Sequence, residues 1–179
     1  LVEQGIDLAI RMGRLADSSL GARYLGVNPW VLVASADYLQ RRGTPDTPEA
    51  LRSHDALIYS SVQGDERWHF SGPDGKALQV PVKGPLRSNN LSALLAAARA
   101  GFGLAALPWY VAHDSVRDGA VQPLLTGWTL PAQEMHAVFS SPRLVPTKVS
   151  GFVDFLQQRF DGEWWAAPTL ASARKGDAL

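Results

Sequence analysis

The segment LVEQGIDLAIRMGRLADSSLGAR, residues 1–23, decides the fold. Residues 1–3 have the character of a last helical turn, closed by Gly5, because glycine adopts the left-handed conformation at many helix ends. Residues 6–12 predict a buried strand, and the Asp-Ser-Ser-Leu run at 17–20 predicts a turn. A helix end, a strand and a turn in direct succession indicate an α/β domain that is already in progress when the chain begins.

The composition excludes several classes of protein. With 179 residues, 46% of them apolar and 19% charged, the chain can bury one sizeable core or two small lobes, which excludes a highly charged disordered polypeptide. It has 17 basic and 17 acidic residues, so its formal net charge is zero. The chain therefore has no excess of positive charge that would favour contact with DNA. No apolar run is long enough to span a membrane, so we expect no membrane partner. The absence of cysteine fits a reducing cytoplasm.

Elements alternate along the first part of the chain. Strands are predicted at 20–25 and 30–34, with a bend at Pro29, which cannot donate to a ladder. The next predicted elements are a short helix at 37–43 and a helix start at 47–51, with Thr47 as its cap. A strand at 57–60 and a hairpin at 67–82 follow them. Asp74-Gly75 is the turn signal of the hairpin.

The clearest helix runs from Ser88 to Gly101. Its apolar positions recur at helical spacing: Leu91, Leu94, Leu95, Ala98 and Phe102. A short buried strand at 104–107 follows, and Pro108 opens a second helix. The rest of the chain predicts an edge strand at 121–125, a strand at 135–140 and a helix after Pro146 with Val149, Phe152, Val153, Leu156 and Phe160 at helical spacing.

Alternating strands and helices predict an α/β protein with mostly parallel sheets. Pro29 and Pro131 mark two crossings between lobes, where the chain leaves one lobe and later returns. We therefore expect lobe I at residues 1–28 and 132–160, lobe II at residues 29–131, and a tail of no clear periodicity at 161–179.

The motif inventory argues against catalysis. The sequence contains no nucleophile elbow, no zinc-protease motif and no phosphate-binding glycine loop. The four histidines, His54, His69, His113 and His136, are scattered without metal-ligand spacing. We expect no enzyme activity, no metal and no cofactor.

Three groups of residues are candidates for ligand binding. The first is Ser88, Asn89 and Asn90, because a helix N-terminus offers N–H groups and a positive dipole end to a carboxylate or similar anion. Ordinary helix capping is the alternative explanation, and the two roles are compatible.

The second and third groups lie near strand ends. Tyr59, Ser60, Ser61 and Trp68 offer hydroxyls and an aromatic face to an organic effector, although a core role for Trp68 is equally favoured. Arg11, Met12 and Gly13 follow the first strand, at the end where ligands bind in open α/β sheets. Pairing of Arg11 with Asp17 is the alternative.

The chain resembles the effector-binding domain of LysR-type transcriptional regulators over about residues 1–160. The resemblance rests on the opening strand-turn-strand, on Val31-Leu32-Val33-Ala34-Ser35 with Tyr38-Leu39 and Gly43-x-Pro45, and on Asn89-Asn90 through Gly101-x-Gly103-Leu104-Ala105-x-Leu107-Pro108. It implies a two-lobed fold like that of type 2 periplasmic solute-binding proteins, with Ser88–Asn90 and Pro108 facing the cleft between the lobes.

The resemblance also implies partners. They are a small-molecule effector, a second or further copies in a homodimer or tetramer, and DNA reached through a helix-turn-helix domain that would precede this chain. In the family, the helix after Ser88 packs against a lobe I helix of the partner subunit. The first part of lobe I would also precede this chain. The alternative is a solute-binding protein of the same fold that serves transport.

Overall fold

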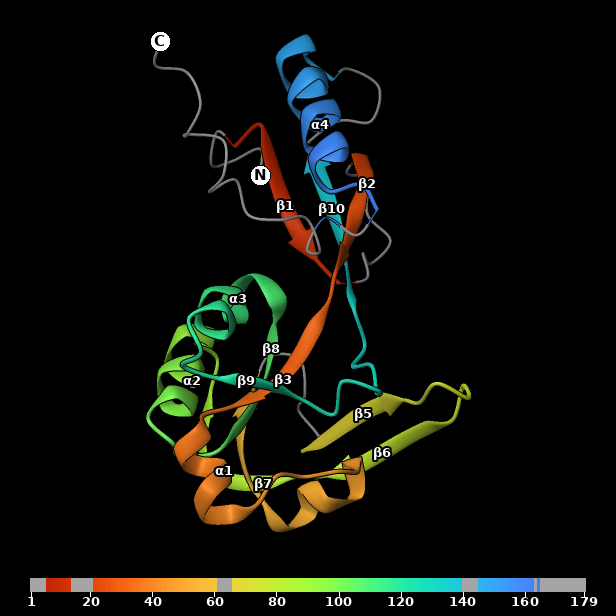
Figure 1. The fold of residues 1–179 in the computed structure, drawn as a ribbon. Helices are drawn as coiled ribbons and strands as arrows, with labels where there is room; N and C mark the ends of the chain where they lie inside the picture. The colour runs from red at the N-terminus through yellow and green to blue at the C-terminus, as the bar shows by residue number, and fades with distance from the viewer. Residues whose placement is uncertain (1–5, 14–20, 61–65, 140–144, 163, 165–179) are drawn as a thin grey trace, which may run out of the picture. The chain divides into compact units, whose positions relative to one another are not determined.

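The computed structural model of the chain describes residues 6–13, 21–60, 66–139, 145–162 and 164. Contacts between Cα atoms divide the chain into two units, shown in Figure 1. Unit 1 is Leu1–Val27 with Glu134–Leu179, and unit 2 is Asn28–Gln133. The predicted helix end at 1–5, the turn at 17–20 and most of the predicted tail lie outside the described residues. No helix in the described part of the chain is long and apolar enough to cross a membrane.

Unit 1 is built on a three-stranded sheet in the order β1-β10-β2. The strands are β1 (Leu8–Met12), β2 (Gly21–Asn28) and β10 (Gln133–Phe139), and the helix α4 (Thr147–Arg159) packs on the sheet. The core contains Leu25, Met135, Ala137, Phe139, Val149 and Val153. Two ion pairs join α4 to the strand segments, Arg23 with Asp154 at 2.8 Å and Lys148 with Asp7 at 2.6 Å.

The predicted strand at 6–12 forms as β1, but the prediction that it is buried was wrong. Ile10 is 42% exposed and Met12 is 43% exposed. The reason is the position of β1 at an edge of the sheet, where it pairs only with β10 among the described strands.

Unit 2 is built on a five-stranded sheet in the order β7-β4-β8-β3-β9. Its strands are β3 (Trp30–Ala34), β4 (Asp55–Tyr59), β7 (Lys83–Ser88), β8 (Leu104–Pro108) and β9 (Gln122–Leu124). The expectation of mostly parallel sheets was wrong, because the sheet is mixed. β4 runs parallel to β7 and β8, whereas β3 runs antiparallel to β8 and β9.

The direction of β3 explains the mixture. Trp30, the first residue of β3, pairs with Pro108, the last residue of β8. The strand that brings the chain into unit 2 therefore starts at the sheet edge where β8 ends, and the two strands run in opposite directions. β7 and β8 are joined by a helix crossover, the connection that parallel strands require.

Helices and a hairpin cover the two faces of this sheet (Figure 1). One face carries α2 (Leu91–Arg99) and α3 (Trp109–Arg117) over a core that includes Val33, Leu57, Leu94 and Leu107. The other carries α1 (Ala36–Arg42), the 3-10 helix η2 (Pro48–Ser53) and the hairpin of β5 (Arg67–Ser71) and β6 (Ala77–Pro81). Side chains of β4 alternate between the two cores, as the period of a strand requires.

Local signals set the ends of the helices. The side chain of Ser35 caps α1 and Gly43 ends it. Thr47 makes no side-chain cap bond, and the segment after it forms a 3-10 turn in place of the predicted α-helix start. The hairpin forms as predicted, and Asp74 Oδ1 accepts the N–H of Lys76 in its turn.

Two aromatic residues assigned to buried helix faces are exposed. Gly101 has a φ of 77° and ends α2, so Phe102 lies beyond the helix and is 64% exposed. Phe152 lies within α4 and is 51% exposed, while Val149 and Val153 of that helix face the core. Phe152 has the predicted helical position, but that spacing did not decide its burial, whereas Phe102 lies outside the helix to which its spacing assigned it.

Candidate functional site

The carboxyl ends of three strands in unit 2 meet at one edge of its sheet. In the sheet register, Tyr59 at the end of β4 pairs with Ser88 at the end of β7. Pro108 at the end of β8 pairs with Trp30 at the start of β3. The backbone N–H of Ser60 donates to the carbonyl of Ser88 at 3.0 Å. We call this set of residues the strand-end edge; with the adjoining helix starts it contains Trp30, Tyr59, Ser60, Ser88, Asn89, Asn90, Pro108 and Tyr110.

The edge thus brings together six of the residues predicted to bind an effector: Tyr59, Ser60, Ser88, Asn89, Asn90 and Pro108. Ligands of open α/β sheets bind outside the carboxyl ends of the strands, so this edge has the position expected of a ligand-binding site. Ser61, predicted with them, lies outside the described residues.

The start of α2 is capped by its own side chains. Asn90 Oδ1 accepts the N–H of Ala93 at 3.2 Å, and Ser88 Oγ accepts the N–H of Asn90 at 3.0 Å. The first helical bond runs from the N–H of Leu94 to the carbonyl of Asn90. The N–H groups of the first turn precede that bond, as at the start of any α-helix. Capping by Asn90 is confirmed, and an anion at this helix start stays a prediction.

Aromatic side chains that the sequence reasoning missed also lie at this edge. The ring centroids of Trp30 and Tyr59 are 5.9 Å apart, with the planes tilted by 43°. Trp30 Nε1 donates to Oε1 of Gln133 at 3.1 Å. The backbone N–H of Trp109 donates to the carbonyl of Pro29 at 2.8 Å, which holds the start of α3 beside the start of β3. The only sequence signal for them was an aromatic residue directly after Pro29 and two more directly after Pro108.

Tyr110, in the first turn of α3, is 53% exposed. Burial raises the pKa of its hydroxyl, and the nearby hydroxyl of Tyr59 raises that pKa further.

None of the described residues that make up the strand-end edge has a charged side chain. Arg87, which precedes Ser88 on β7, is paired with Glu66. The described residues of this edge offer aromatic surface, hydroxyls, amides and backbone N–H groups to a ligand.

The remaining predicted residues lie elsewhere. Trp68 is fully buried in the core under the hairpin, which supports the core role, and its indole N–H has no hydrogen-bond partner among the described residues. Arg11, Met12 and Gly13 belong to unit 1, where Arg11 pairs in the sheet with His136 and the N–H of Gly13 donates to the carbonyl of Glu134 at 2.8 Å. Asp17, the alternative partner of Arg11, lies outside the described residues.

The histidines and acids of the described segments do not gather into a group of three that could hold a metal ion. His54 is buried in unit 2 and contacts the hydroxyl of Tyr38, with 3.1 Å between the Tyr38 oxygen and His54 Nδ1. Its position inside the unit gives it a structural role.

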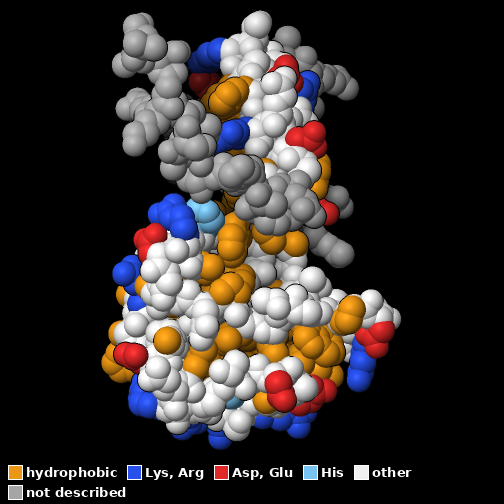
Figure 2. Space-filling model, viewed as in Figure 1, with side chains coloured by type: hydrophobic (Ala, Val, Ile, Leu, Met, Phe, Trp, Pro, Cys, Tyr) orange, Lys and Arg blue, Asp and Glu red, His pale blue; other side chains and the backbone are white. Residues whose placement is uncertain are grey.

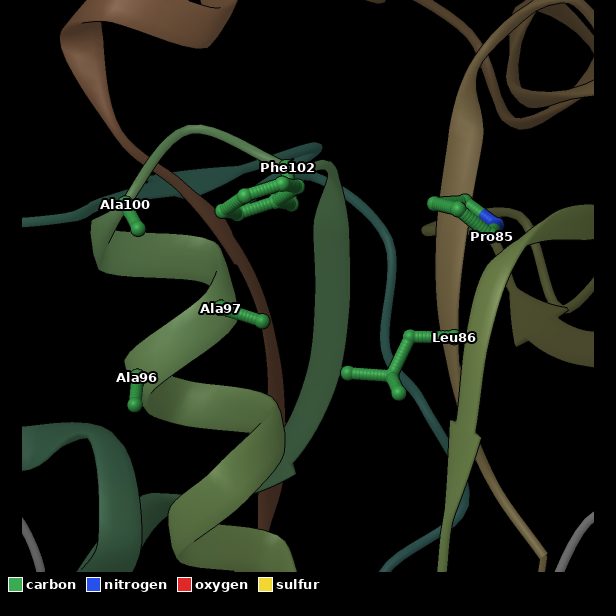
Figure 3. Close-up of a pocket in the computed structure, with 6 residues that line it drawn as sticks. All are labelled: Pro85, Leu86, Ala96, Ala97, Ala100 and Phe102. Atoms are coloured by element: carbon green, nitrogen blue, oxygen red, sulfur yellow. The ribbon is translucent and has the colours of Figure 1, made fainter.

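A second feature of unit 2 is an apolar groove between α2 and β7, with a volume of about 490 Å³ (Figure 3). Ala97 and Leu86 point toward one another across it, and Phe102 and Pro85 lie at one end. The groove is lined by Pro85, Leu86, Ala96, Ala97, Ala100 and Phe102. It adjoins β7, the first strand in the sheet order, whose outer edge pairs with no described strand.

Hydrophobic and charged side chains occupy different parts of the visible surface of unit 2 (Figure 2). On the face seen in Figure 2, hydrophobic side chains gather toward the middle of the unit and charged side chains lie mainly toward its rim.

Comparison with known families decides the identity of the fold. A model of the LysR substrate binding domain matches residues 1–161. This chain belongs to the LysR substrate-binding domain family. The similar proteins are transcriptional regulators, so the alternative assignment to a transport protein is not favoured. Transcriptional regulators are also generally not enzymes.

Relatives of this LysR domain are identical to it at about a third of the aligned positions. An HTH-type transcriptional regulator of Xanthomonas campestris is 37% identical over 96% of this chain and 53% of its own length. The HTH-type transcriptional activator AaeR of Escherichia coli is 31% identical over 89% of this chain and 52% of its own length. The chain thus spans about half the length of the curated relatives it matches.

Solved structures give the same fold. The regulatory domain of CrgA, a LysR-type regulator from Neisseria meningitidis, has a TM-score of 0.74 and 27% identity, covering 89% of this chain and 78% of that domain. The α/β fold of this chain is accordingly the type 2 periplasmic-binding-protein-like fold of LysR substrate-binding domains, with mixed sheets.

Proposed function

We propose that this chain is the effector-sensing and dimerisation part of a transcriptional regulator that binds DNA through a separate helix-turn-helix domain. The similar proteins are HTH-type regulators about twice as long as the matched region. A chain with no net charge is also poorly suited to holding DNA by itself. In this proposal units 1 and 2 are lobes I and II, a ligand shifts their equilibrium arrangement, and the regulator acts in the cytoplasm.

We propose the strand-end edge of unit 2 as an effector-binding surface. Arg11, Met12 and Gly13 of unit 1 stay predicted effector contacts. The observation that carries the proposal is the convergence of Tyr59, Ser88 and Pro108 at one edge through the sheet register. The α2 start adds N–H groups and a positive dipole end, so a carboxylate is the favoured ligand group.

The test separates binding from capping. Replacing Asn90 with Asp keeps a capping oxygen but adds a negative charge at the α2 start, where it stabilises the helix by about 0.3–1 kcal/mol. We expect N90D to fold normally and to bind carboxylate ligands more weakly, because the new charge repels them. Asn90→Ser is the matched control, since it retains a capping oxygen without a charge.

Ligands for this test come from a thermal-shift screen of the chain with carboxylates, sugars and amino acids. A ligand present at 100 times its dissociation constant adds about 2.7 kcal/mol to the free energy of unfolding. Calorimetry on N90D and N90S then compares the affinities. Equal binding by both variants would remove the α2 start from the site, and a screen in which no ligand shifts the melt would contradict effector sensing by this chain.

We also propose that the apolar groove and the outer edge of β7 form the surface on which a second copy docks. Phe102 is the most exposed large hydrophobic residue at this surface, at 64%. Such a residue beside a strand edge that pairs with no described strand suits an interface, because exposed edges pair readily and apolar patches favour association. A tetramer would require a further surface on the same molecule.

The variant Phe102→Lys tests this surface. A buried, unpaired lysine at an interface is costly, so we expect F102K to shift the chain from dimer to monomer in sedimentation equilibrium while the melting temperature stays close to that of the unaltered chain. Phe152→Lys, in α4 of unit 1 with 51% exposure of the original ring, is the matched control. An unaltered chain that is monomeric at all concentrations would contradict this proposal.

A further inference from the structure

Unit 1 contains a pocket of its own, between β2 and the end of α4. Its volume is about 390 Å³, which lies within the range of small-molecule sites. It is lined by residues 24–27 of β2 and by residues 157, 158 and 160–162, at and just beyond the end of α4. We propose that this pocket binds a small organic cation with an apolar stem. None of its lining residues belongs to the strand-end edge, so the site is separate from the proposed effector surface.

Hydrogen bonds hold the two walls of this pocket together. The side-chain amide of Gln157, on α4, donates to the backbone carbonyl of Tyr24 at 2.9 Å. Beyond the helix, the indole N–H of Trp164 donates to the backbone carbonyl of Val27 at 2.7 Å. The pocket is therefore part of the fold of unit 1, and a ligand would enter it at little cost in ordering the walls.

Part of the lining is apolar. Leu25 belongs to the core of unit 1, and Phe160 and Trp164 pack against that core. The rings of Phe160 and Trp164 meet edge to face, with centroids 5.2 Å apart. Gly26 lets the end of α4 lie directly on β2, because a Cβ atom there would overlap the carbonyl oxygen of Phe160. These groups suit the hydrocarbon stem of a ligand.

The end of α4 gives the pocket a negative potential. The N–H of Phe160 donates to the carbonyl of Leu156 in the last helical bond, and the carbonyls that follow Leu156 have no partner within the helix. Such a helix end is equivalent to roughly half a negative charge. Asp161 follows directly and adds a carboxylate. One of its oxygens accepts the N–H of Gly162 at 2.9 Å, and a carboxylate can accept further bonds.

The lining supplies no positive charge to balance this potential. None of the described residues that line the pocket is a lysine or an arginine. Arg159, the basic residue in the last turn of α4, is not among them. A negative pocket with an apolar wall is complementary to an ammonium or guanidinium group on a hydrocarbon stem, and it repels anions.

Calorimetry on the full 179-residue chain tests the proposal with two probes that share one stem, 2-phenylethylammonium and 2-phenylethanol. We expect the ammonium compound to bind roughly tenfold more tightly than the alcohol, because only its head group is attracted by Asp161 and the α4 end. Raising the salt concentration should reduce that difference, because salt screens the attraction between exposed charges. Carboxylate probes are left out, since the strand-end edge is the surface proposed to bind them.

Substitutions of Gln158 give opposite expectations at one position. Gln158 is exposed on α4 and lines the pocket. Gln158→Lys adds a cation, which is favourable near the end of a helix, so Q158K should fold and lose most of its binding of 2-phenylethylammonium. Gln158→Glu adds a negative charge at the same place and should bind this probe more tightly. Both variants should bind 2-phenylethanol as the unaltered chain does.

The carboxylate itself is tested by Asp161→Asn. We expect D161N to bind 2-phenylethylammonium several-fold more weakly and to leave binding of the alcohol unchanged. Asp46→Asn is the matched control, because Asp46 is an exposed acid of unit 2 and its replacement changes the net charge by the same amount.

Three results would overturn the cation site. They are equal affinities for the ammonium compound and the alcohol, unchanged ammonium binding in both Q158K and D161N, and no binding of 2-phenylethylammonium at all. None of them affects the proposed function, which rests on the strand-end edge of unit 2 and on carboxylate ligands. Conversely, loss of carboxylate binding in the variants of Asn90 would leave this pocket in unit 1 unchanged.

Discussion

At the scale of single residues, the buried pair of Tyr38 and His54 shows how the tertiary structure changes the pKa of a side chain. The Tyr38 hydroxyl accepts the N–H of Asp55 at 2.8 Å, and its oxygen lies 3.1 Å from His54 Nδ1, within hydrogen-bond distance. Burial lowers the pKa of His54, and the nearby Arg42 lowers it further, against a smaller opposing effect of Asp55.

This lowered pKa predicts a loss of stability in mild acid. As the pH falls below about 6.5, the unfolded chain binds a proton at His54 while the folded chain does not. The free energy of unfolding therefore decreases from that pH down to the folded pKa, and is unaffected by this group above it. Urea unfolding at a series of pH values between 7.5 and 5 measures the slope.

The variant His54→Leu should unfold with a shallower pH dependence than the unaltered chain over that window. His113→Leu is the control, because His113 is partly exposed on α3 beside Asp114. An unchanged pH slope in H54L would show that His54 titrates alike in both states.

At the scale of elements, the close approach of β7 to β4 depends on one glycine. A Cβ atom added at Gly84 would overlap the backbone nitrogen, carbonyl carbon and carbonyl oxygen of Ala56. The pairing register of the two strands shifts between Asp55 and Leu57, at the same place. Glycine in a strand often marks such a contact between backbones.

We expect Gly84→Ala to destabilise the chain by roughly 1–3 kcal/mol, because the neighbouring atoms belong to backbone and cannot rotate away. Gly127→Ala is the matched control, since an added Cβ there would meet nothing within 4 Å. Denaturant unfolding of both variants measures the difference. Equal stabilities would mean that β7 can move away from β4 without cost.

At the scale of the whole molecule, the described residues bury more apolar surface in unit 2 than in unit 1. Unit 2 contains two core clusters, one on each face of its sheet, whereas the described part of unit 1 contains one small cluster under α4. β1 of unit 1 also leaves Ile10 and Met12 partly exposed. Regions with few buried contacts open at lower free energy.

Hydrogen exchange should therefore proceed faster in β1 and β10 than in β4 and β8. A core truncation tests whether the units open separately. Val153→Ala, expected to cost roughly 0.5–3 kcal/mol, should accelerate exchange in β10 and leave β8 unchanged, whereas Leu94→Ala should accelerate exchange in β8. Uniform acceleration throughout the chain by either variant would show instead that the two units unfold as one.

The sequence by itself determined the features that depend on neighbours along the chain. Asn90 and Gly101 delimit α2, and Asp74 makes the hairpin turn, because caps and turns are satisfied by residues a few positions away. The opening strand-turn-strand, the segment from Val31 to Pro45 and the segment from Asn89 to Pro108 together indicated the family, which the family model then confirmed over residues 1–161.

Only the tertiary structure decided which strands lie side by side and which side chains meet at their ends. The antiparallel direction of β3 and the exposure of Phe102 and Met12 depend on distant partners. The contact of Trp30 with Tyr59 joins residues far apart in sequence, so no local pattern could reveal it. Local hydrogen bonds are encoded over a few residues, but burial and strand order depend on the packing of the whole unit.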